Sequence, residues 1–502
     1  TFAFELKPGI YVRSIQVYAD AVHSAIADVN RLHGLSLTPV FAAPVLAGSG
    51  TSELGRNMMR TIRTDFQGDR ADPALVQWFC KHRYSTRPYS YVAEIDEMNA
   101  MMRAESPDRE ALPIIYSEFN HSTGRNWARP ETTFTCDTPE AFRNQASVWG
   151  LASRAGAKAF YQFKFASELR MANSVCKTLI RDHDPGTPVG SARDIGDSTK
   201  NAEVTRLFAE GFAHARPLLD PGCRSADINV IPLCSRDPAT GRIHLWLPQP
   251  NSRADYPLTV DLRGLGIPAG ALLQIKEVSA ACFGETVQRL PVTDQPLALT
   301  QPRDSVWLIG VEPRPSRMEI LPPEADGEVR QGAEAERCFG GTPVMGVRQG
   351  SDGNNRISFI RFRLPADLAT VRRVLLRIRG RAEGPAGEAF DHLVYGTPAA
   401  DWDEQTLNAR QAPAVCRTVS AVSKVDLDTR PVGHLSFMPG AAARTAWLDV
   451  TDYVTGYPGA AVTFVLIKEK KYPDDDFRAC STSFATREEA QESHRPALEV
   501  WR

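Results

Sequence analysis

The residues best placed to do chemistry stand at the end of one apolar segment. Residues 112–120 run from Leu112 through two isoleucines to Ser117, Glu118 and Phe119, so a carboxylate closes a buried strand. In (β/α) barrels catalytic groups lie at the carboxyl ends of strands, which would point Glu118 into a cleft. A retaining glycosidase needs a nucleophilic carboxylate there, close to a second carboxyl group that donates a proton. The alternative is a strand-end glutamate in solvent or in an ion pair.

Two further groups of residues could complete such a site. His82, Arg83 and Tyr84 end the preceding apolar segment, and Glu5 stands shortly before Pro8 near the start of the chain. Histidine, arginine and tyrosine hydrogen-bond sugar hydroxyls and help to keep a neighbouring carboxylate ionised. A buried histidine beside a solvated arginine is the competing interpretation. The sequence therefore predicts a sugar-binding cleft around two carboxylates.

The elements that must position these residues alternate between β-rich and helical segments up to about residue 220. Such alternation is typical of βα units around a parallel sheet. The expected strands are residues 2–6, 37–46, 75–81, 112–117 and 157–165. The expected helices are residues 17–32, 52–64, 91–104, 139–155 and 200–215. We expect about five units of a (β/α)8 barrel in residues 1–220.

From about residue 221 helical periodicity disappears, and short alternating segments separated by turn residues predict antiparallel β-sandwiches. The expected strands of a first sandwich are residues 228–233, 242–247, 258–262, 272–278 and 305–311. A proline-rich joint at residues 312–315 and 322–323 separates them from a second set. That set comprises residues 356–364, 371–380, 391–395, 446–450, 462–467 and 497–501. We therefore expect a multidomain chain: the barrel portion 1–220, a β-sandwich accessory domain 221–315 and a β-sandwich 316–502.

The composition of the chain excludes several classes of binding partner. The chain has 502 residues and a formal net charge of −2, so no global field favours nucleic acid or an anionic membrane. No apolar run approaches the ~20 residues that a membrane helix needs. The nine cysteines show no zinc-ligand spacing, so we expect no metal and no cofactor in catalysis. Asp401 and Asp403 could hold a structural calcium ion, although alternate carboxylates also occur in plain polar turns.

The strand ends described above resemble the clan-A glycoside hydrolases, and most closely the family 86 β-agarases and β-porphyranases. The likeness rests on the His-Arg-Tyr strand end, on Ser-Glu-Phe-Asn at residues 117–120, on residues 156–165, and on the course of the first sandwich from residue 228 to residue 308. The resemblance implies that Glu118 is the nucleophile. It also implies that His82, Trp127 and Lys164 line the cleft, together with Arg83 and Tyr84.

The acid/base position departs from the pattern of that clan. The fourth barrel strand there typically closes with Asn-Glu-Pro, and aligning its proline with Pro8 places Lys7 where the proton donor belongs. An ammonium with a pKa near about 10.4 is a poor acid for a sugar leaving group. Either Glu5 donates the proton with a shift in position, or the site lacks its proton donor.

The last 180 or so residues resemble the DNRLRE-type β-sandwich modules of secreted polysaccharide-degrading proteins. The matching segments are residues 358–364, 400–408, 447–454 and 495–500. The resemblance implies a carbohydrate-binding module and a secreted or cell-surface protein. Trp402 and Trp447 within it are more often sandwich core than sugar-stacking platforms.

Two classes of function remain open. One is a retaining glycoside hydrolase acting on an agar- or porphyran-type galactan. The other is a catalytically inactive carbohydrate-binding or structural protein derived from such a hydrolase, suggested by Lys7, the incomplete barrel and a glycosylation sequon at Asn120. Five strands would leave two unpaired sheet edges, so we expect another chain, or an earlier segment of the same precursor, to complete the barrel. A native mass equal to one such chain would contradict this.

Overall fold

The computed structural model describes most of the chain in two compact units. The α/β unit comprises residues 1–136 and 144–179, and the sandwich unit comprises residues 137–143 and 180–502. The described residues are 8–46, 55–57, 76–85, 87–105, 107, 110–120, 139–162, 199–213, 216–220, 222, 232–249, 253–315, 317–348, 355–384, 389–413, 430–468 and 481–502.

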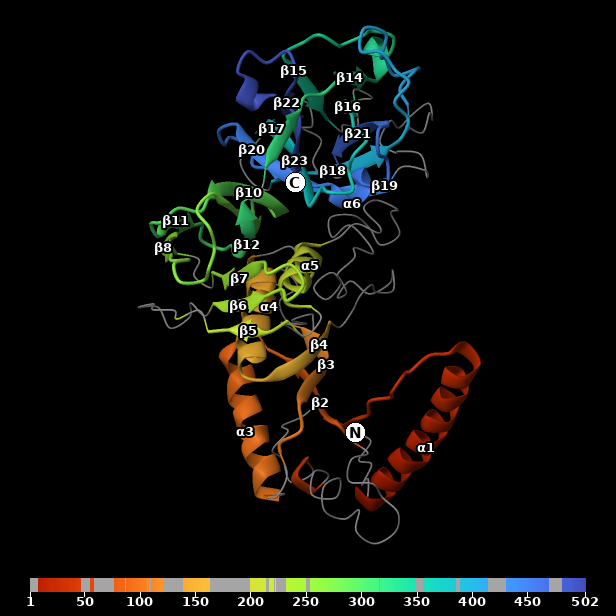
Figure 1. Ribbon diagram of the computed structural model, residues 1–502, viewed down its shortest axis with the longest axis vertical. Helices are drawn as coiled ribbons and strands as arrows, with labels where there is room; N and C mark the ends of the chain where they lie inside the picture. The colour runs from red at the N-terminus through yellow and green to blue at the C-terminus, as the bar shows by residue number, and fades with distance from the viewer. Residues whose placement is uncertain are drawn as a thin grey trace, which may run out of the picture. The chain divides into compact units, whose positions relative to one another are not determined.

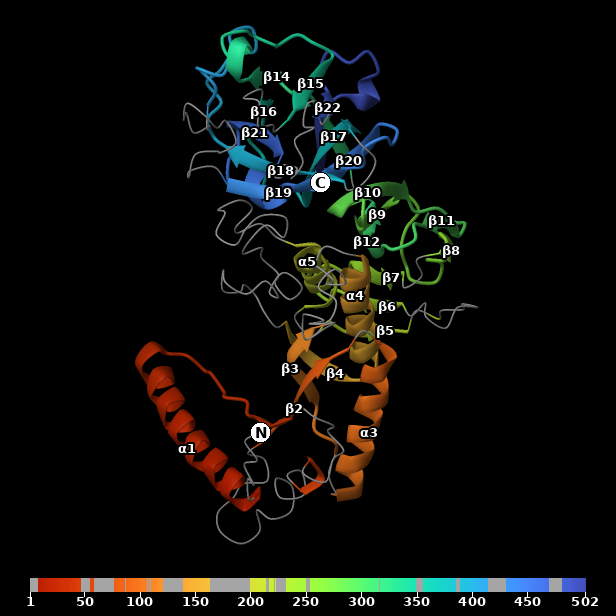
Figure 2. The same cartoon turned by 180° about the vertical axis from the view of Figure 1, so that it is seen from behind.

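The α/β unit contains a parallel sheet in the order β1-β2-β3-β4. Its strands are β1 (Ala42–Leu46), β2 (Trp78–Tyr84), β3 (Ile114–Asn120) and β4 (Ala157–Gln162). The helices are α1 (Pro8–His33), α3 (Tyr89–Glu105) and α4 (Pro139–Arg154), and Figures 1 and 2 show α3 beside β2 from opposite sides. This confirms four of the five predicted strands and the helices expected at residues 17–32, 91–104 and 139–155. The fifth strand, residues 2–6, lies outside the described residues. Of the helix expected at residues 52–64, only residues 55–57 are described.

Helix α3 shows why the sequence folds this way. Tyr91, Ile95, Met98 and Met102 recur at helical spacing and are all fully buried. Such a stripe covers one face of a sheet. The rings of Tyr91 and Tyr116 meet edge to face with their centroids 5.2 Å apart, so α3 packs directly on β3. The helix therefore fixes the strand that carries the candidate nucleophile.

The first sandwich of the sandwich unit is built on antiparallel strands. They are β5 (Leu218–Leu219), β6 (Leu233–Arg236), β7 (Ile243–Pro248), β9 (Ala271–Val278), β10 (Phe283–Pro291) and β12 (Val306–Pro315), with β8 (Tyr256–Val260) and β11 (Leu297–Gln301) as a second small sheet. All eight residues of β9 are buried, because α5 (Lys200–Phe212) packs on the face opposite to the apolar core. The ring of Phe208 on α5 meets that of Trp246 on β7 at 5.3 Å.

The second sandwich has two facing layers around an apolar core. One layer is β14 (Ala325–Arg330), β16 (Arg356–Arg363), β21 (Ala461–Lys468), β18 (Phe390–Thr397) and β19 (Arg430–Phe437). The other is β13 (Met318–Leu321), β23 (Ala497–Trp501), β17 (Arg373–Glu383) and β20 (Arg444–Asp449), with β15 (Val344–Val347) and β22 (Ser481–Ala485). The short helix α6 (Thr451–Val454) follows β20.

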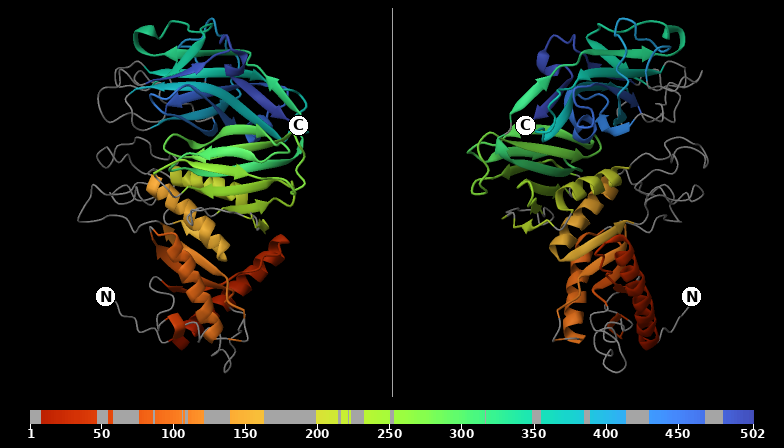
Figure 3. Two further views of the ribbon diagram at one scale, coloured as in Figure 1. Left: turned by 90° about the vertical axis from the view of Figure 1, so that its left-hand side faces the viewer. Right: turned by 45° about the vertical axis from the view of Figure 1, so that its right-hand side comes forward.

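The two sandwiches share a sheet. Thr286 on β10 pairs with Trp447 on β20 in antiparallel register, which joins the two sets of strands into one path. Figure 3 shows the green strands of the first sandwich next to the cyan and blue strands of the second. We call the region where β10 and β20 meet the seam. The three-part division at residues 220 and 315 stays a prediction.

Candidate functional site

The first candidate site is the carboxyl edge of the parallel sheet. In the register of β2 and β3, His82 is paired with Glu118 and Tyr84 with Asn120. The register shifts between Lys81 and His82, because β3 has an extra residue, Ser117, just before this edge. Because parallel strands end at the same edge, the backbones of His82 and Glu118 lie side by side there. The structure thus brings together the two strand ends that the sequence singled out.

Arg83 and His82 belong to different faces of β2. The Nη1 atom of Arg83 lies 3.0 Å from Oε1 of Glu94 on α3, and its guanidinium lies 5.3 Å from the ring centre of Tyr91. Lys81 pairs with the same Glu94 oxygen at 3.3 Å. Residues two apart in a strand share a face, so positions 81 and 83 face α3 and position 82 faces the other way. The side chains of His82 and Arg83 therefore lie on opposite faces of β2 and do not line the same surface.

The remaining predicted site residues are described only in part or not at all. The structure describes the backbone of Glu118. Glu5, Trp127 and Lys164 lie outside the described residues. Their roles stay predictions.

Glu94 is a buried carboxylate that the sequence did not single out. Besides Lys81 and Arg83, it accepts a 3.5 Å hydrogen bond from the hydroxyl of Tyr116. Burial lowers the pKa of Lys81, and the charge of Glu94 opposes that shift. A single glutamate within an amphipathic helix gives no signal of this role. Glu94 fixes the ends of β2 and β3 against α3 and so positions the candidate edge.

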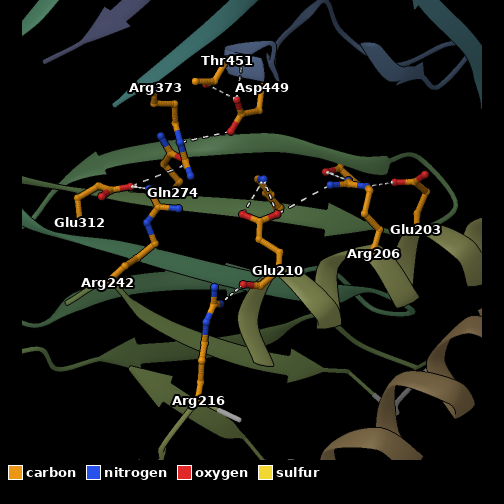
Figure 4. Close-up of polar contacts among 12 residues, drawn as sticks. Glu203, Arg206, Glu210, Arg216, Arg242, Gln274, Glu312, Arg373, Asp449 and Thr451 are labelled. Carbon is orange, nitrogen blue, oxygen red and sulfur yellow. Dashed lines mark hydrogen bonds and ion pairs between the residues drawn. The ribbon is translucent and has the colours of Figure 1, made fainter. Parts of the chain in front are cut away.

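A second candidate site is a cavity of about 430 Å³ at the seam, which we call the seam cavity. Its lining comes from α5, from the first sandwich and from the second, and most of the charged side chains appear in Figure 4. The cationic lining residues are Arg206, Arg242, Lys276, Arg372, Arg373 and Arg430. The acidic ones are Glu210, Asp449 and Asp452. Two of the six cations have partners just outside the lining, since Arg206 pairs with Glu203 at 2.7 Å and Arg242 with Glu312 at 2.5 Å. Six cations against these five carboxylates leave an excess of one positive charge.

Glu210 on α5 is the centre of this network. Its two oxygens accept from Nζ of Lys276 at 2.9 and 2.7 Å, and Arg206 lies 3.8 Å away. Burial alone would raise the pKa of Glu210, but Lys276, then Arg373 and Arg206, hold it well below its usual range. The carboxylate is therefore ionised at neutral pH and ties α5 to β9.

Arg373 on β17 links the two sandwiches across the cavity. Its Nε atom lies 3.3 Å from Asp449, and its Nη1 atom donates to Oε1 of Gln274 on β9. Asp449 also accepts from the hydroxyl of Thr451 at 2.6 Å. Beside it, Arg242 pairs with Glu312 at 2.5 Å. No sequence pattern groups these residues, because they lie up to about 210 positions apart.

The two tryptophans of the second sandwich have different surroundings. Trp402 is buried, donates to the hydroxyl of Thr463 at 3.0 Å and packs on Phe359, which makes it core. Trp447 is only partly buried and donates to Glu499 at 3.1 Å. The guanidinium of Arg289 lies 5.5 Å from the centre of the Trp447 ring.

The described residues were also compared with what a metal site or a membrane-spanning helix requires. Within the described part of the chain, no group of three or more His, Cys, Asp or Glu side chains could hold a metal ion. Asp403 uses one oxygen to cap Gln405 at 2.7 Å in a turn, and calcium at Asp401 and Asp403 stays a prediction. None of the described helices is long and apolar enough to cross a bilayer.

Comparison with known protein families supports the resemblance drawn for the last part of the chain. Residues 318–500 match the model of carbohydrate-binding module family 96. No curated protein sequence matches the chain. Among solved structures, a glucosidase from Croceicoccus marinus is similar with a TM-score of 0.41 at 12% identity, over 62% of this chain and 65% of its own.

Two structures of glycoside hydrolase family 86 are also similar. BuGH86 in complex with neoagarooctaose gives a TM-score of 0.35 at 9% identity, covering 95% of this chain and 65% of its own. A β-porphyranase from the human gut bacterium Bacteroides plebeius gives 0.34 at 11% identity, covering 92% and 69%. The chain spans about half to two thirds of the length of the solved structures that it matches. Likeness at these TM-scores says nothing of the substrate.

Proposed function

We propose that the chain acts on polysaccharide as a retaining glycoside hydrolase, with an agar- or porphyran-type galactan as its substrate class. The observation that carries the proposal is the register that sets Glu118 beside His82 at the carboxyl edge of β2 and β3. The match of residues 318–500 to a carbohydrate-binding module supports a polysaccharide as the ligand. A nucleophilic carboxylate at a strand end, held among polar groups, is what this chemistry requires.

In the proposed reaction the Glu118 carboxylate attacks the anomeric carbon as the glycosidic bond breaks. Glu5 protonates the departing glycosidic oxygen, and water then releases the sugar from Glu118 while the acid group takes back a proton. His82, Tyr84, Trp127 and Lys164 bind the sugar in this proposal. The same role for Arg83 has the weakest support, since its guanidinium pairs with Glu94.

A second candidate function is carbohydrate binding without hydrolysis. The family match covers the binding module and leaves the α/β unit outside it, which favours this alternative. Lys7 at the position of the proton donor favours it as well.

Reducing-sugar release from agar-type and other galactans distinguishes the two functions. We expect Glu118→Gln to lower the rate by at least about a thousandfold, because the amide cannot form the glycosyl intermediate. Glu110→Gln is the matched control, since this exposed glutamate precedes the opposite end of the same strand. Equal rates in wild type and Glu118→Gln would remove Glu118 from the mechanism. Binding of galactan with no hydrolysis in either would establish the second function.

Two further expectations accompany this proposal. Among the described strands, β1 pairs only with β2 and β4 only with β3, and α1 exposes Val17, Tyr18 and Leu32. Both features support another chain, or another segment of the precursor, against this sheet. A carbohydrate-binding module also supports a secreted or cell-surface location.

A further inference from the structure

The seam cavity has more positive charge than its own carboxylates balance. Lys276 is matched by Glu210 and Arg373 by Asp449. Arg372 and Arg430 line the same cavity, are exposed, and have no ion-pair partner within the described part of the chain. Two cations at the mouth of a polar cavity are therefore free to meet an anion from solvent.

The inner wall of the cavity brings two guanidinium groups close together. Burial lowers the pKa of Arg242, and the like charge of the neighbouring Arg373 lowers it further. Their shared carboxylate Glu312 lies 2.5 Å from Arg242 and 3.9 Å from Arg373. Arg373 also pairs with Asp449 at 3.3 Å, so the inner wall itself is balanced. The net positive charge of the cavity comes from Arg372 and Arg430, which face only Asp452 in the lining.

Two donors in the lining are buried without a hydrogen-bond partner among the residues that the structure describes. They are Nε of Arg242 and the hydroxyl of Tyr453, whose side chain is only 3% exposed. Leaving a buried donor unsatisfied is unfavourable, and a ligand that accepts from it removes that cost. These donors point to an acceptor-rich ligand rather than to an apolar one.

We propose that the seam cavity binds an oxyanion substituent of an acidic polysaccharide, a sulfate ester or a uronate carboxylate. Planar guanidinium groups match such oxyanions with paired hydrogen bonds. The cavity volume of about 430 Å³ lies in the range of small-ligand sites and accommodates a charged sugar unit. The inference rests on the proposed function in that it takes the ligand to be a polysaccharide, and it narrows the class to charged glycans.

The position of the cavity has a consequence for stability. Lys276 belongs to the first sandwich and Arg373 and Arg430 to the second, so one ligand would contact both. A ligand that binds only the folded arrangement raises the unfolding midpoint. We therefore expect a charged glycan to stabilise the sandwich unit, and a neutral galactan to do so less.

The experiment measures binding of the full chain, carrying Glu118→Gln to prevent hydrolysis, by calorimetry and by the shift of its unfolding midpoint. The probes are a sulfated galactan, the same polymer after desulfation, a polyuronate and inorganic sulfate. The test variant is Arg372→Gln with Arg430→Gln. The control is Arg303→Gln with Arg381→Gln, which removes two exposed arginines outside the cavity lining.

We expect the test variant to bind the charged polymers about tenfold more weakly and the control variant to bind them as the parent does. Loss only with the sulfated galactan identifies the sulfate ester, and loss only with the polyuronate identifies the carboxylate. Equal loss in test and control variants would overturn the proposal, since it would show general attraction to surface charge. Binding of inorganic sulfate with no binding of the charged polymers would also overturn it, because the cavity would then hold an adventitious ion only.

Failure of this inference is distinguishable from failure of the proposed function. If the parent binds the neutral galactan as tightly as the sulfated one, and neither variant changes this, the oxyanion site is refuted while polysaccharide binding stands. If no polymer binds at all, both fail. Because all four substituted arginines are exposed, unfolding midpoints without ligand should stay unchanged and so exclude misfolding as the cause.

Discussion

Arg289 on β10 gives the sharpest test of how the two sandwiches are held together. Its guanidinium lies over two indole rings of the second sandwich, 5.5 Å from the centre of Trp447 and 4.6 Å from that of Trp501. Its Nη1 atom pairs with the buried carboxylate of Glu499, and its side chain is 10% exposed. Burial and the charge of Arg377 lower the pKa of Arg289 to about 10, so it is still charged at neutral pH.

The cost of Arg289→Ala follows from these contacts. Two desolvated cation–π contacts are worth about 1 kcal/mol each. Without Arg289, Glu499 would still pair with Arg377 at 3.5 Å and accept from the indole N–H of Trp447 at 3.1 Å. Losing the Arg289–Glu499 ion pair therefore costs about 1 kcal/mol, less than leaving a buried charge with no partner. We expect the free energy of unfolding to fall by about 3 kcal/mol in total. Arg289→Lys should lose about half of this, because a compact ammonium cannot stack on both rings as a planar guanidinium does.

Equilibrium unfolding of the full chain in urea, followed by tryptophan fluorescence, measures this change. A double-mutant cycle of Arg289→Ala with Glu499→Gln isolates the ion pair, for which we expect a coupling of about 1 kcal/mol. Arg337→Ala is the matched control, since its guanidinium lies 5.3 Å from the ring of Phe339 but is 68% exposed. A loss below about 0.5 kcal/mol for Arg289→Ala, equal to that of the control, would refute the reasoning.

Two more predictions concern buried groups of the second sandwich. Burial, and then the charge of Glu488, raises the pKa of Asp326 to about 7. The folded chain therefore holds a proton that the unfolded chain has lost between about pH 4 and pH 7, and stability should fall as pH rises through this window. In the Asp326→Asn variant, the free energy of unfolding should decrease over this pH range by up to about 4 kcal/mol less than in the wild type. The same pH dependence of unfolding in both proteins would contradict this prediction. Gly396→Ala should cost about 1 to 3 kcal/mol, because its Cβ would lie 2.5 Å from Cζ of Tyr453, whereas Gly310→Ala, 4.0 Å from its nearest neighbour, should be neutral in the same urea assay.

The sequence predicted the elements whose buried residues are apolar. Helix α3 and strands β2 and β3 follow from their hydrophobic spacing, and the expected ranges differ from the observed ones only at the ends. Strands β10 and β14 were missed because charged or polar side chains are buried in them. Glu285 on β10 and Asp326 on β14 are each almost fully buried, which a hydrophobic pattern cannot anticipate.

Of the two candidate sites, one could be predicted from the sequence and the other could not. The carboxyl edge at Glu118 could be predicted, since a local motif at a strand end places it. The seam cavity could not, because Glu210 and Lys276 lie 66 positions apart and meet only when α5 folds onto β9. Neither residue has an unusual local sequence. Long-range ion pairs depend on tertiary packing, which propensity and periodicity do not contain.

The seam shows why those buried charges matter to the architecture. Backbone pairing joins the sandwiches at Thr286 and Trp447, so side chains must supply much of the remaining cohesion. Glu285 on β10 accepts from Arg444 on β20 at 2.5 Å and from the backbone N–H of Ser436 on β19 at 3.2 Å. Directional charged contacts fix the relative position of two surfaces more closely than apolar packing does, because each depends on distance and angle. A cavity whose walls come from both sandwiches then keeps a defined shape, which is what selective recognition of a charged sugar requires.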